Sequence, residues 1–187
     1  MLIALAGLAT HAGCGNLDIG GEGTFDLVRD TTPEIQQLPC DACGGDCILE
    51  KLSYDQRYHV TEPIDYADMP PAGGPHHPCW ADFGTHAEAV PDERWVHNLE
   101  HGAVVALYRC DEACESPPAD LQEWAATIGP WTVVTPYDPM TSPYAVLAWQ
   151  YRLQTSCFDE EAFRAFYEAY VDQAPESTLA GEPESCM

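Results

Sequence analysis

Basic side chains are scarce in this 187-residue chain, which has 7 lysine and arginine residues against 31 aspartate and glutamate residues. The formal net charge is −24, and Lys51 is the single lysine. A surface this negative repels the phosphate backbone of nucleic acids, so we expect no nucleic-acid partner. The same field attracts cations, although acidic surfaces also serve solubility alone.

Long apolar segments are also missing. The N-terminal run, residues 1–14, is apolar but too short to span a bilayer. Its small residues lead into Cys14, as in the export signal and cleavage box of bacterial lipoproteins. We therefore predict an exported protein, extracellular or in the bacterial cell envelope, that contacts the membrane only through a lipid on Cys14.

Cysteine, by contrast, is frequent. Without Cys14, eight cysteines remain, an even number that suits up to four disulfides in an oxidising compartment. Cys40 and Cys43 also have the spacing of redox pairs and metal knuckles, but structural disulfides are the favoured interpretation for an exported chain. The spacing does not select the pairs. The candidates are Cys40, Cys43, Cys47, Cys79, Cys110, Cys114, Cys157 and Cys186.

The chain divides into the signal segment, a flexible spacer over residues 15–39 and a single α+β domain over residues 40–187. Within the domain, residues 58–91 are rich in histidine, proline and glycine and predict a long irregular loop, which in a compact domain is usually functional. The regular part has the order β-α-β-β-α, which favours a small sheet covered by helices on one face. Periodicity predicts strands over 103–108, 131–135 and 144–152 and helices over 91–101, 118–128 and 160–174.

Six of the seven histidines fall between positions 59 and 101. His97 and His101 are four residues apart, so on the predicted helix they share one face and can bind one ion. Neutral imidazole is a common ligand of zinc and copper. The alternative is a buried hydrogen-bond network in which each ring donates to a backbone carbonyl.

Several short motifs occur together between residues 58 and 175. They are His59, Pro70-Pro71-Ala-Gly-Gly-Pro75-His76, Trp80, Val90-Pro91-Asp-Glu-Arg94 and Val96-His97-Asn-Leu-Glu-His101-Gly102. This combination resembles the domain-of-unknown-function 3105 family of exported or membrane-anchored proteins. The resemblance implies no activity, but it includes four histidines, His59, His76, His97 and His101.

We predict these four histidines as metal ligands, with Glu100 as a further ligand or as the acceptor of an imidazole N–H. An imidazole-rich site suits copper or zinc, whereas calcium or magnesium would require oxygen ligands. A thioether from Met69 or Met140 would favour copper, but packing is the simpler role for both residues.

The sequence is consistent with four functional hypotheses. The favoured one is a non-catalytic protein that stores, senses or transfers a transition-metal ion. The segment His97-x-x-Glu100-His101 matches the inverted zinc-protease motif, which would make the chain a metallohydrolase, although Gly102 ends any helix there. A disulfide exchanger built on Cys40 and Cys43 would need an activated thiolate. The fourth is a structural module that binds other envelope components.

Overall fold

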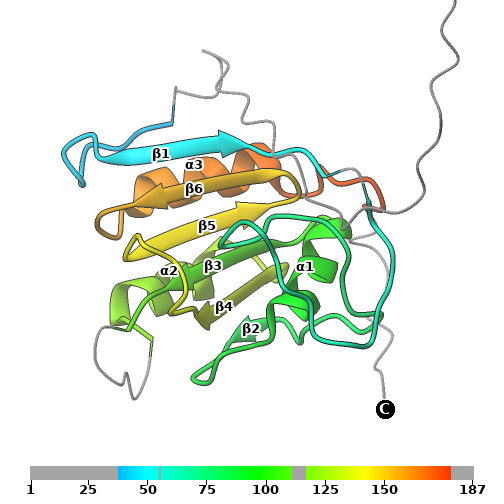
Figure 1. The fold of residues 1–187 in the computed structure, drawn as a ribbon. Coiled ribbons are helices and arrows are strands. Elements are labelled where there is room, and N and C mark those ends of the chain that lie inside the picture. Colours follow the sequence, from blue (N-terminus) through cyan, green and yellow to red (C-terminus); the bar gives the residue numbers. More distant parts are fainter. Residues whose placement is uncertain (1–37, 55, 111–116, 178–187) are drawn as a thin grey trace, which may run out of the picture.

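The computed structural model describes residues 38–54, 56–110 and 117–177, which form a six-stranded mixed sheet with three helices (Figure 1). The predicted α+β class is confirmed. The elements are β1 (Cys47–Lys51), β2 (Gly84–Thr85), α1 (Asp92–Glu100), β3 (Val104–Tyr108), α2 (Ala119–Ile128), β4 (Thr132–Pro136), β5 (Tyr144–Ala148), β6 (Tyr151–Thr155) and α3 (Glu160–Tyr170).

Strand β3 lies inside the sheet, whose strand order is β1-β6-β5-β3-β4-β2. It pairs parallel with β4, which follows it after α2, and antiparallel with β5. All five of its residues are buried, as expected for a strand covered on both faces. The continuous apolar run predicted as a strand is therefore an interior strand.

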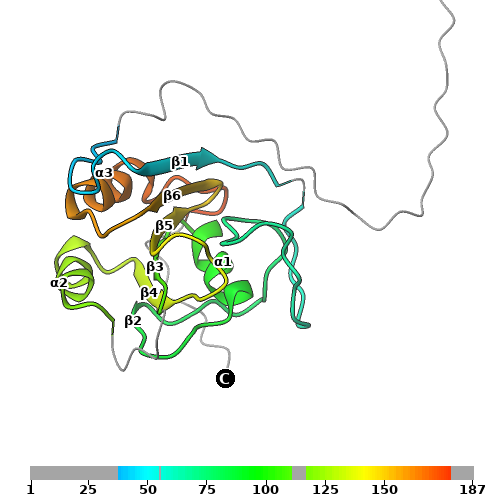
Figure 2. The ribbon, with the colours of Figure 1, turned by 60° about the vertical axis from the view of Figure 1, so that its left-hand side comes forward.

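Helices cover both faces of the sheet. Figure 2 shows α2 and α3 on one side and α1, with the long loop, on the other. Val104 of β3 belongs to the core under α2 and α3, whereas Val105 belongs to the core that contains Trp95 of α1. The expectation of helices on one face is thus wrong for α1. This helix buries His97, Asn98 and Glu100 together with its apolar residues, so hydropathy alone did not indicate how it packs.

The segment predicted as one strand over residues 144–152 is two antiparallel strands, β5 and β6. The chain reverses at Trp149 and Gln150, and Gln150 has a φ of 66°. A left-handed conformation is uncommon for glutamine, and no glycine, asparagine or proline marks this turn. The local sequence therefore contains no turn pattern that would predict this hairpin. Strand β1 was also not predicted, because this edge strand is only partly buried and lacks a strong apolar pattern.

The last helix begins as predicted and ends earlier. Asp159 is its N-cap, and its side chain accepts a hydrogen bond from the Ala162 N–H at 3.0 Å. This bond satisfies one of the free donors of the first turn. The helix ends at Tyr170 instead of at residue 174.

The long loop before α1 is irregular but packed. Residues 70–76 are buried without interruption. Arg152 of β6, which is 1% exposed, fixes this segment to the sheet. Its guanidinium donates to Glu50 at 2.9 and 2.7 Å, to Asp68 at 2.9 Å and to the Pro70 carbonyl at 2.7 Å. A buried arginine with three acceptors holds the loop at a defined place beside the sheet.

Disulfides join the N-terminal part of the described domain to its body. Cys40 pairs with Cys47, Cys43 pairs with Cys157, and the described residues Cys79 and Cys110 are disulfide-bonded as well. The prediction of structural disulfides is confirmed for these six cysteines. Because Cys40 and Cys43 have different partners, they are not bonded to each other as the redox pair of a disulfide exchanger would be.

Some predictions fall outside the described residues. These are the N-terminal segment 1–14 with Cys14, the spacer as far as residue 37, and the disulfide candidates Cys114 and Cys186. Among the helices that are described, none has the length and apolar character needed to cross a bilayer.

Candidate metal centre

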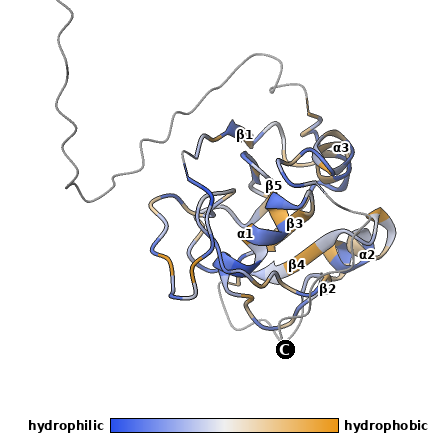
Figure 3. Ribbon diagram, turned by 90° about the vertical axis from the view of Figure 1, so that its right-hand side faces the viewer, coloured by the Kyte–Doolittle hydropathy of each residue, from blue (hydrophilic) through white to orange (hydrophobic). Residues whose placement is uncertain are grey.

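Helix α1 is polar in sequence but buried in the structure. Figure 3 shows α1 in hydrophilic colours beside the apolar strands β3 and β4. Every residue from Trp95 to Glu100 is buried, and these include His97 and Asn98. Buried polar side chains need hydrogen-bond or ionic partners, so the partners of this helix define the site.

Asn98 fixes the loop against α1. Its Oδ1 accepts from the Ala81 N–H at 2.8 Å, and its Nδ2 donates to the Ala81 carbonyl at 2.9 Å. The His77 N–H adds a hydrogen bond to the Glu93 carbonyl at 2.9 Å. The histidines of the loop are therefore held next to the histidines of the helix.

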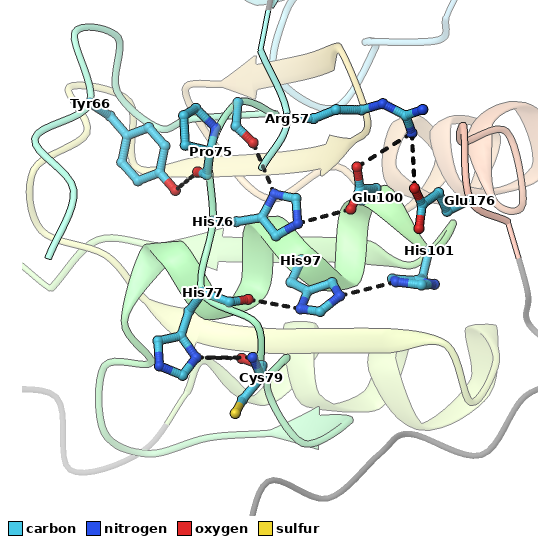
Figure 4. Close-up of polar contacts among 11 residues, drawn as sticks. Arg57, Tyr66, Pro75, His76, His77, Cys79, His97, Glu100, His101 and Glu176 are labelled. Carbon is cyan, nitrogen blue, oxygen red and sulfur yellow. Dashed lines mark hydrogen bonds and ion pairs between the residues drawn. The ribbon is translucent and has the colours of Figure 1, made fainter. Parts of the chain in front are cut away.

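Two buried histidines, His76 and His97, are oriented by backbone carbonyls (Figure 4). His97 Nδ1 donates to the His77 carbonyl at 2.8 Å, and His76 Nδ1 donates to the Gly74 carbonyl at 2.9 Å. A carbonyl can only accept, so each ring carries a proton on Nδ1 and, when neutral, has its lone pair on Nε2. Metal-bound histidines are usually oriented in this way.

Four of the predicted ligands converge. His59, His76, His97 and Glu100 each offer one ligand atom, and these atoms lie within 4.8 Å of one another. The ring centroids of the three histidines are 4.8 to 5.0 Å apart. His59 is exposed, whereas the other three residues are buried. The cluster thus reaches solvent on the His59 side.

The contact between His76 and Glu100 is incomplete as a hydrogen bond. Nε2 of His76 lies 2.8 Å from Oε2 of Glu100. This nitrogen is buried, however, and has no partner in hydrogen-bonding geometry among the described residues. With Nδ1 protonated and the ring neutral, two lone-pair atoms face each other, so a proton or another cation is needed between them.

Electrostatics favours metal-binding protonation states. Burial, followed by the neighbouring His76 and His101, lowers the pKa of His97 to about 4. Burial raises the pKa of Glu100, but the close contact with His76, acting through a proton on that ring, and the charge of Arg57 outweigh it and hold that pKa below its ordinary value. At neutral pH the site thus contains a neutral His97 and an ionised Glu100, as metal binding requires.

His101 lies at the edge of this cluster. Its Nε2 is 3.0 Å from Nε2 of His97, but it belongs to a second group of potential ligands, with Glu100 and Glu176. Burial lowers the pKa of His101, against the opposing effect of these two carboxylates. The helix ends at Glu100 and His101 is its C-cap, so the His97-x-x-Glu100-His101 motif does not lie within a continuous helix.

Arg57 and Glu176 are parts of the site that sequence reasoning missed. Arg57 NH1 lies 3.5 Å from Glu100 Oε1 and 3.4 Å from Glu176 Oε1. Glu176 follows the last helix, and no motif marks it. Arg57 precedes His59 by two residues, and its position there is the single sequence signal that could have suggested it.

His77 and His86, the other histidines of the described loop, bond to nearby backbone groups and do not belong to the cluster. The ring of His77 accepts from the Cys79 N–H at 3.0 Å, and His86 Nε2 lies 2.8 Å from the Asp82 carbonyl. Met69 and Met140 pack in the core with the aromatic and aliphatic residues, the role expected for them.

The family described as "Protein of unknown function (DUF3105)" matches residues 59–183. This range contains all five predicted ligands. No curated protein and no solved structure matches the chain.

Proposed function

We propose that this chain, which belongs to the DUF3105 family, binds a transition-metal ion, copper or zinc, through His59, His76, His97 and Glu100. His101 lies beside them, with its Nε2 3.0 Å from Nε2 of His97. The protein stores, senses or transfers the ion without catalysis. It is exported and anchored to the bacterial cell envelope by a lipid on Cys14.

The observation that carries this proposal is the convergence of His59, His76, His97 and Glu100, in which Nε2 of His76 lies 2.8 Å from Glu100 without the geometry of a hydrogen bond. A network in which each ring donates to a carbonyl accounts for the Nδ1 atoms of His76 and His97. The Nε2 atoms of the same rings lie 2.8 Å from Glu100 and 3.0 Å from His101, and one ligand atom from each of the four residues lies within reach of a single ion. One divalent ion would satisfy these lone pairs together.

The composition of the site supports copper or zinc. Three imidazoles and one carboxylate are ligands that both ions accept, whereas magnesium and calcium take oxygen ligands. The methionines near the site pack in the core, so no thioether from them favours copper.

The number of ligands supports a non-catalytic role. A catalytic zinc site keeps one position open for water, and four protein ligands would complete a tetrahedral ion. Because His59 is the exposed ligand, the ion would enter and leave the site on the His59 side. The metallohydrolase remains the second hypothesis, and it requires Glu100 to activate a metal-bound water instead of binding the ion.

Export is supported by the disulfides. Six of the described cysteines are disulfide-bonded, which is typical of proteins that mature in an oxidising compartment. Lipid attachment at Cys14 would be tested by mass spectrometry of the membrane fraction, with a Cys14→Ser variant as the control.

The metal proposal is tested by elemental analysis of oxidised protein without a histidine tag, loaded competitively with copper and zinc. The test variant is His76→Ala with His97→Ala. The matched control is His86→Ala, which removes a histidine outside the cluster. We expect close to one ion per chain in the wild type and the control, and loss of that ion in the double variant.

No retained metal in a folded wild-type protein would overturn the proposal, as would equal retention by the double variant. If the double variant does not fold, the cobalt-substituted wild type provides the test. Its visible absorption is expected to show tetrahedral coordination with nitrogen ligands, and a spectrum of hydrated cobalt would contradict the assignment.

A further inference from the structure

An open pocket of about 720 Å³ is lined in part by Arg57, which also lies 3.5 Å from Glu100 of the histidine cluster. It is formed by the end of β1, the β5–β6 turn and the segment that follows α3, which lie on the same side of the molecule in Figures 1 and 2. None of the residues predicted from the sequence as ligands lines it.

Two of the 7 basic residues of the chain line this pocket. Lys51 and Arg57 line it with one acidic residue, Asp172, whereas acidic residues outnumber basic ones 31 to 7 in the whole chain. Arg57 is engaged with Glu100 and Glu176. Within the ranges that the structure covers, Lys51 has no carboxylate at ion-pair distance, and its ammonium lies 5.9 Å from the centroid of the Tyr151 ring. Among the described residues, the Lys51 ammonium in this pocket thus has no carboxylate counter-ion, although the protein is strongly acidic.

Aromatic rings form much of the pocket wall. Tyr151 and Tyr170 are stacked, with ring centroids 4.2 Å apart and an interplanar angle of 25°. Tyr54 and Trp149 line the pocket as a second pair, with centroids 6.4 Å apart. Flat aromatic walls favour a ligand that has a planar ring.

Both non-glycine residues with positive φ among those described border this pocket. They are Gln150, with φ of 66°, and Asp172, with φ of 64°. Backbone hydrogen bonds hold them there, from the Gln150 N–H to the Ala72 carbonyl at 2.7 Å and from the Asp172 N–H to the Gly102 carbonyl at 2.8 Å. Uncommon backbone conformations tend to gather at binding sites, where the surrounding structure maintains them.

We infer that this pocket binds a small organic anion that carries an aromatic ring. Its carboxylate pairs with the ammonium of Lys51, and its ring packs on the tyrosine and tryptophan walls. A charged hydrogen bond selects the anion, and the aromatic walls select a flat ligand. The inference does not depend on the proposed metal site, because none of the four converging ligands contributes to the pocket.

The test is isothermal titration of the oxidised full chain, in EDTA, with phenylacetate and with its neutral analogue 2-phenylethanol. Lys51→Gln removes the charge, and Lys51→Arg keeps it. Arg164→Gln is the matched control, because this exposed arginine pairs with Glu160 on α3, outside the pocket. Thermal unfolding confirms that each variant is folded.

We expect saturable binding of phenylacetate that is about tenfold weaker in Lys51→Gln and restored in Lys51→Arg. Arg164→Gln is expected to bind as the wild type does. Absence of saturable binding, equal binding of 2-phenylethanol, or unchanged binding by Lys51→Gln would overturn the inference. Since EDTA removes any metal, failure here is distinguishable from failure of the metal proposal.

Discussion

The Nε2 atoms of His97 and His101 lie 3.0 Å apart at the C-terminal end of α1, one helical turn from each other. The proximity of these two atoms does not make the two residues equivalent. His97 belongs to the four-residue cluster, whereas His101 groups with Glu100 and Glu176. The two groups share Glu100, but the two histidines of the sequence pair have different further neighbours.

The first prediction compares alanine variants at these two positions. His101→Ala should weaken metal binding by less than about tenfold, because His101 contacts Nε2 of His97, whereas the His77 carbonyl orients the ring through Nδ1. His97→Ala should weaken it considerably more, because a ligand is lost. Competition against a chelator of known affinity measures both effects. Equal losses would instead make His101 a direct ligand.

The second prediction concerns the amide of Asn98. Asn98→Ala leaves the buried N–H and carbonyl of Ala81 without their partners, so we expect the free energy of unfolding to fall by about 2–4 kcal/mol. Urea unfolding in EDTA measures this value. Arg94→Ala, on the same helix but partly exposed, is the control and should change it by less than about 1 kcal/mol. Similar stabilities of the two variants would show that the Asn98 bonds do not fix the loop.

The third prediction ranks the two assigned disulfides. The Cys43–Cys157 bond joins residues 114 positions apart, whereas the Cys40–Cys47 bond joins residues 7 apart. A disulfide that closes a longer loop removes more entropy from the unfolded chain. The Cys43–Cys157 bond should therefore stabilise the protein by about 2 kcal/mol more than the Cys40–Cys47 bond. Urea unfolding of the two paired cysteine-to-serine variants tests this order. A larger loss from the short loop would mean that local contacts, not loop entropy, dominate.

The elements that the sequence predicted best are those whose pattern reflects burial directly. Leu121 and Trp124 mark the buried face of α2, and the run before Tyr108 marks an interior strand. The β5–β6 turn was missed because Gln150 adopts its left-handed conformation through backbone bonds to Ala72 and Leu52, which are distant in sequence. Local propensity carries no information about such bonds.

The sequence likewise predicted some residues of the candidate site and missed others. Helical spacing placed His97 next to His101, and the family pattern added His59 and His76. The approach of Glu176 to Arg57 depends on the path of the chain after α3, which no local pattern specifies. For the same reason the pocket around Lys51 was not predicted, since it is built from the ends of several elements.

The last prediction concerns the pH dependence of stability through Asp92, at the start of α1. Its Oδ2 accepts from the Tyr137 hydroxyl at 3.2 Å. Burial is the main cause that raises the pKa of Asp92 from 3.8 to about 6, with a further contribution from Glu93. Between these values the folded state binds more protons than the unfolded state, so the stability contributed by this group falls as pH rises from about 4 to about 6.

Asp92→Asn should remove this dependence, because the amide does not titrate. We expect the variant to gain on the order of 2 kcal/mol relative to the wild type between pH 4 and pH 7, less any loss of the favourable charge at the helix N-terminus. Urea unfolding across this pH range, in EDTA, measures the difference. Glu161→Gln in the first turn of α3 is the control, because its side chain is exposed, and its curve should run parallel to that of the wild type. If the Asp92→Asn curve also runs parallel, the folded protein does not favour protonation of Asp92, and the partly buried carboxylate is stabilised by contacts other than the Tyr137 hydroxyl.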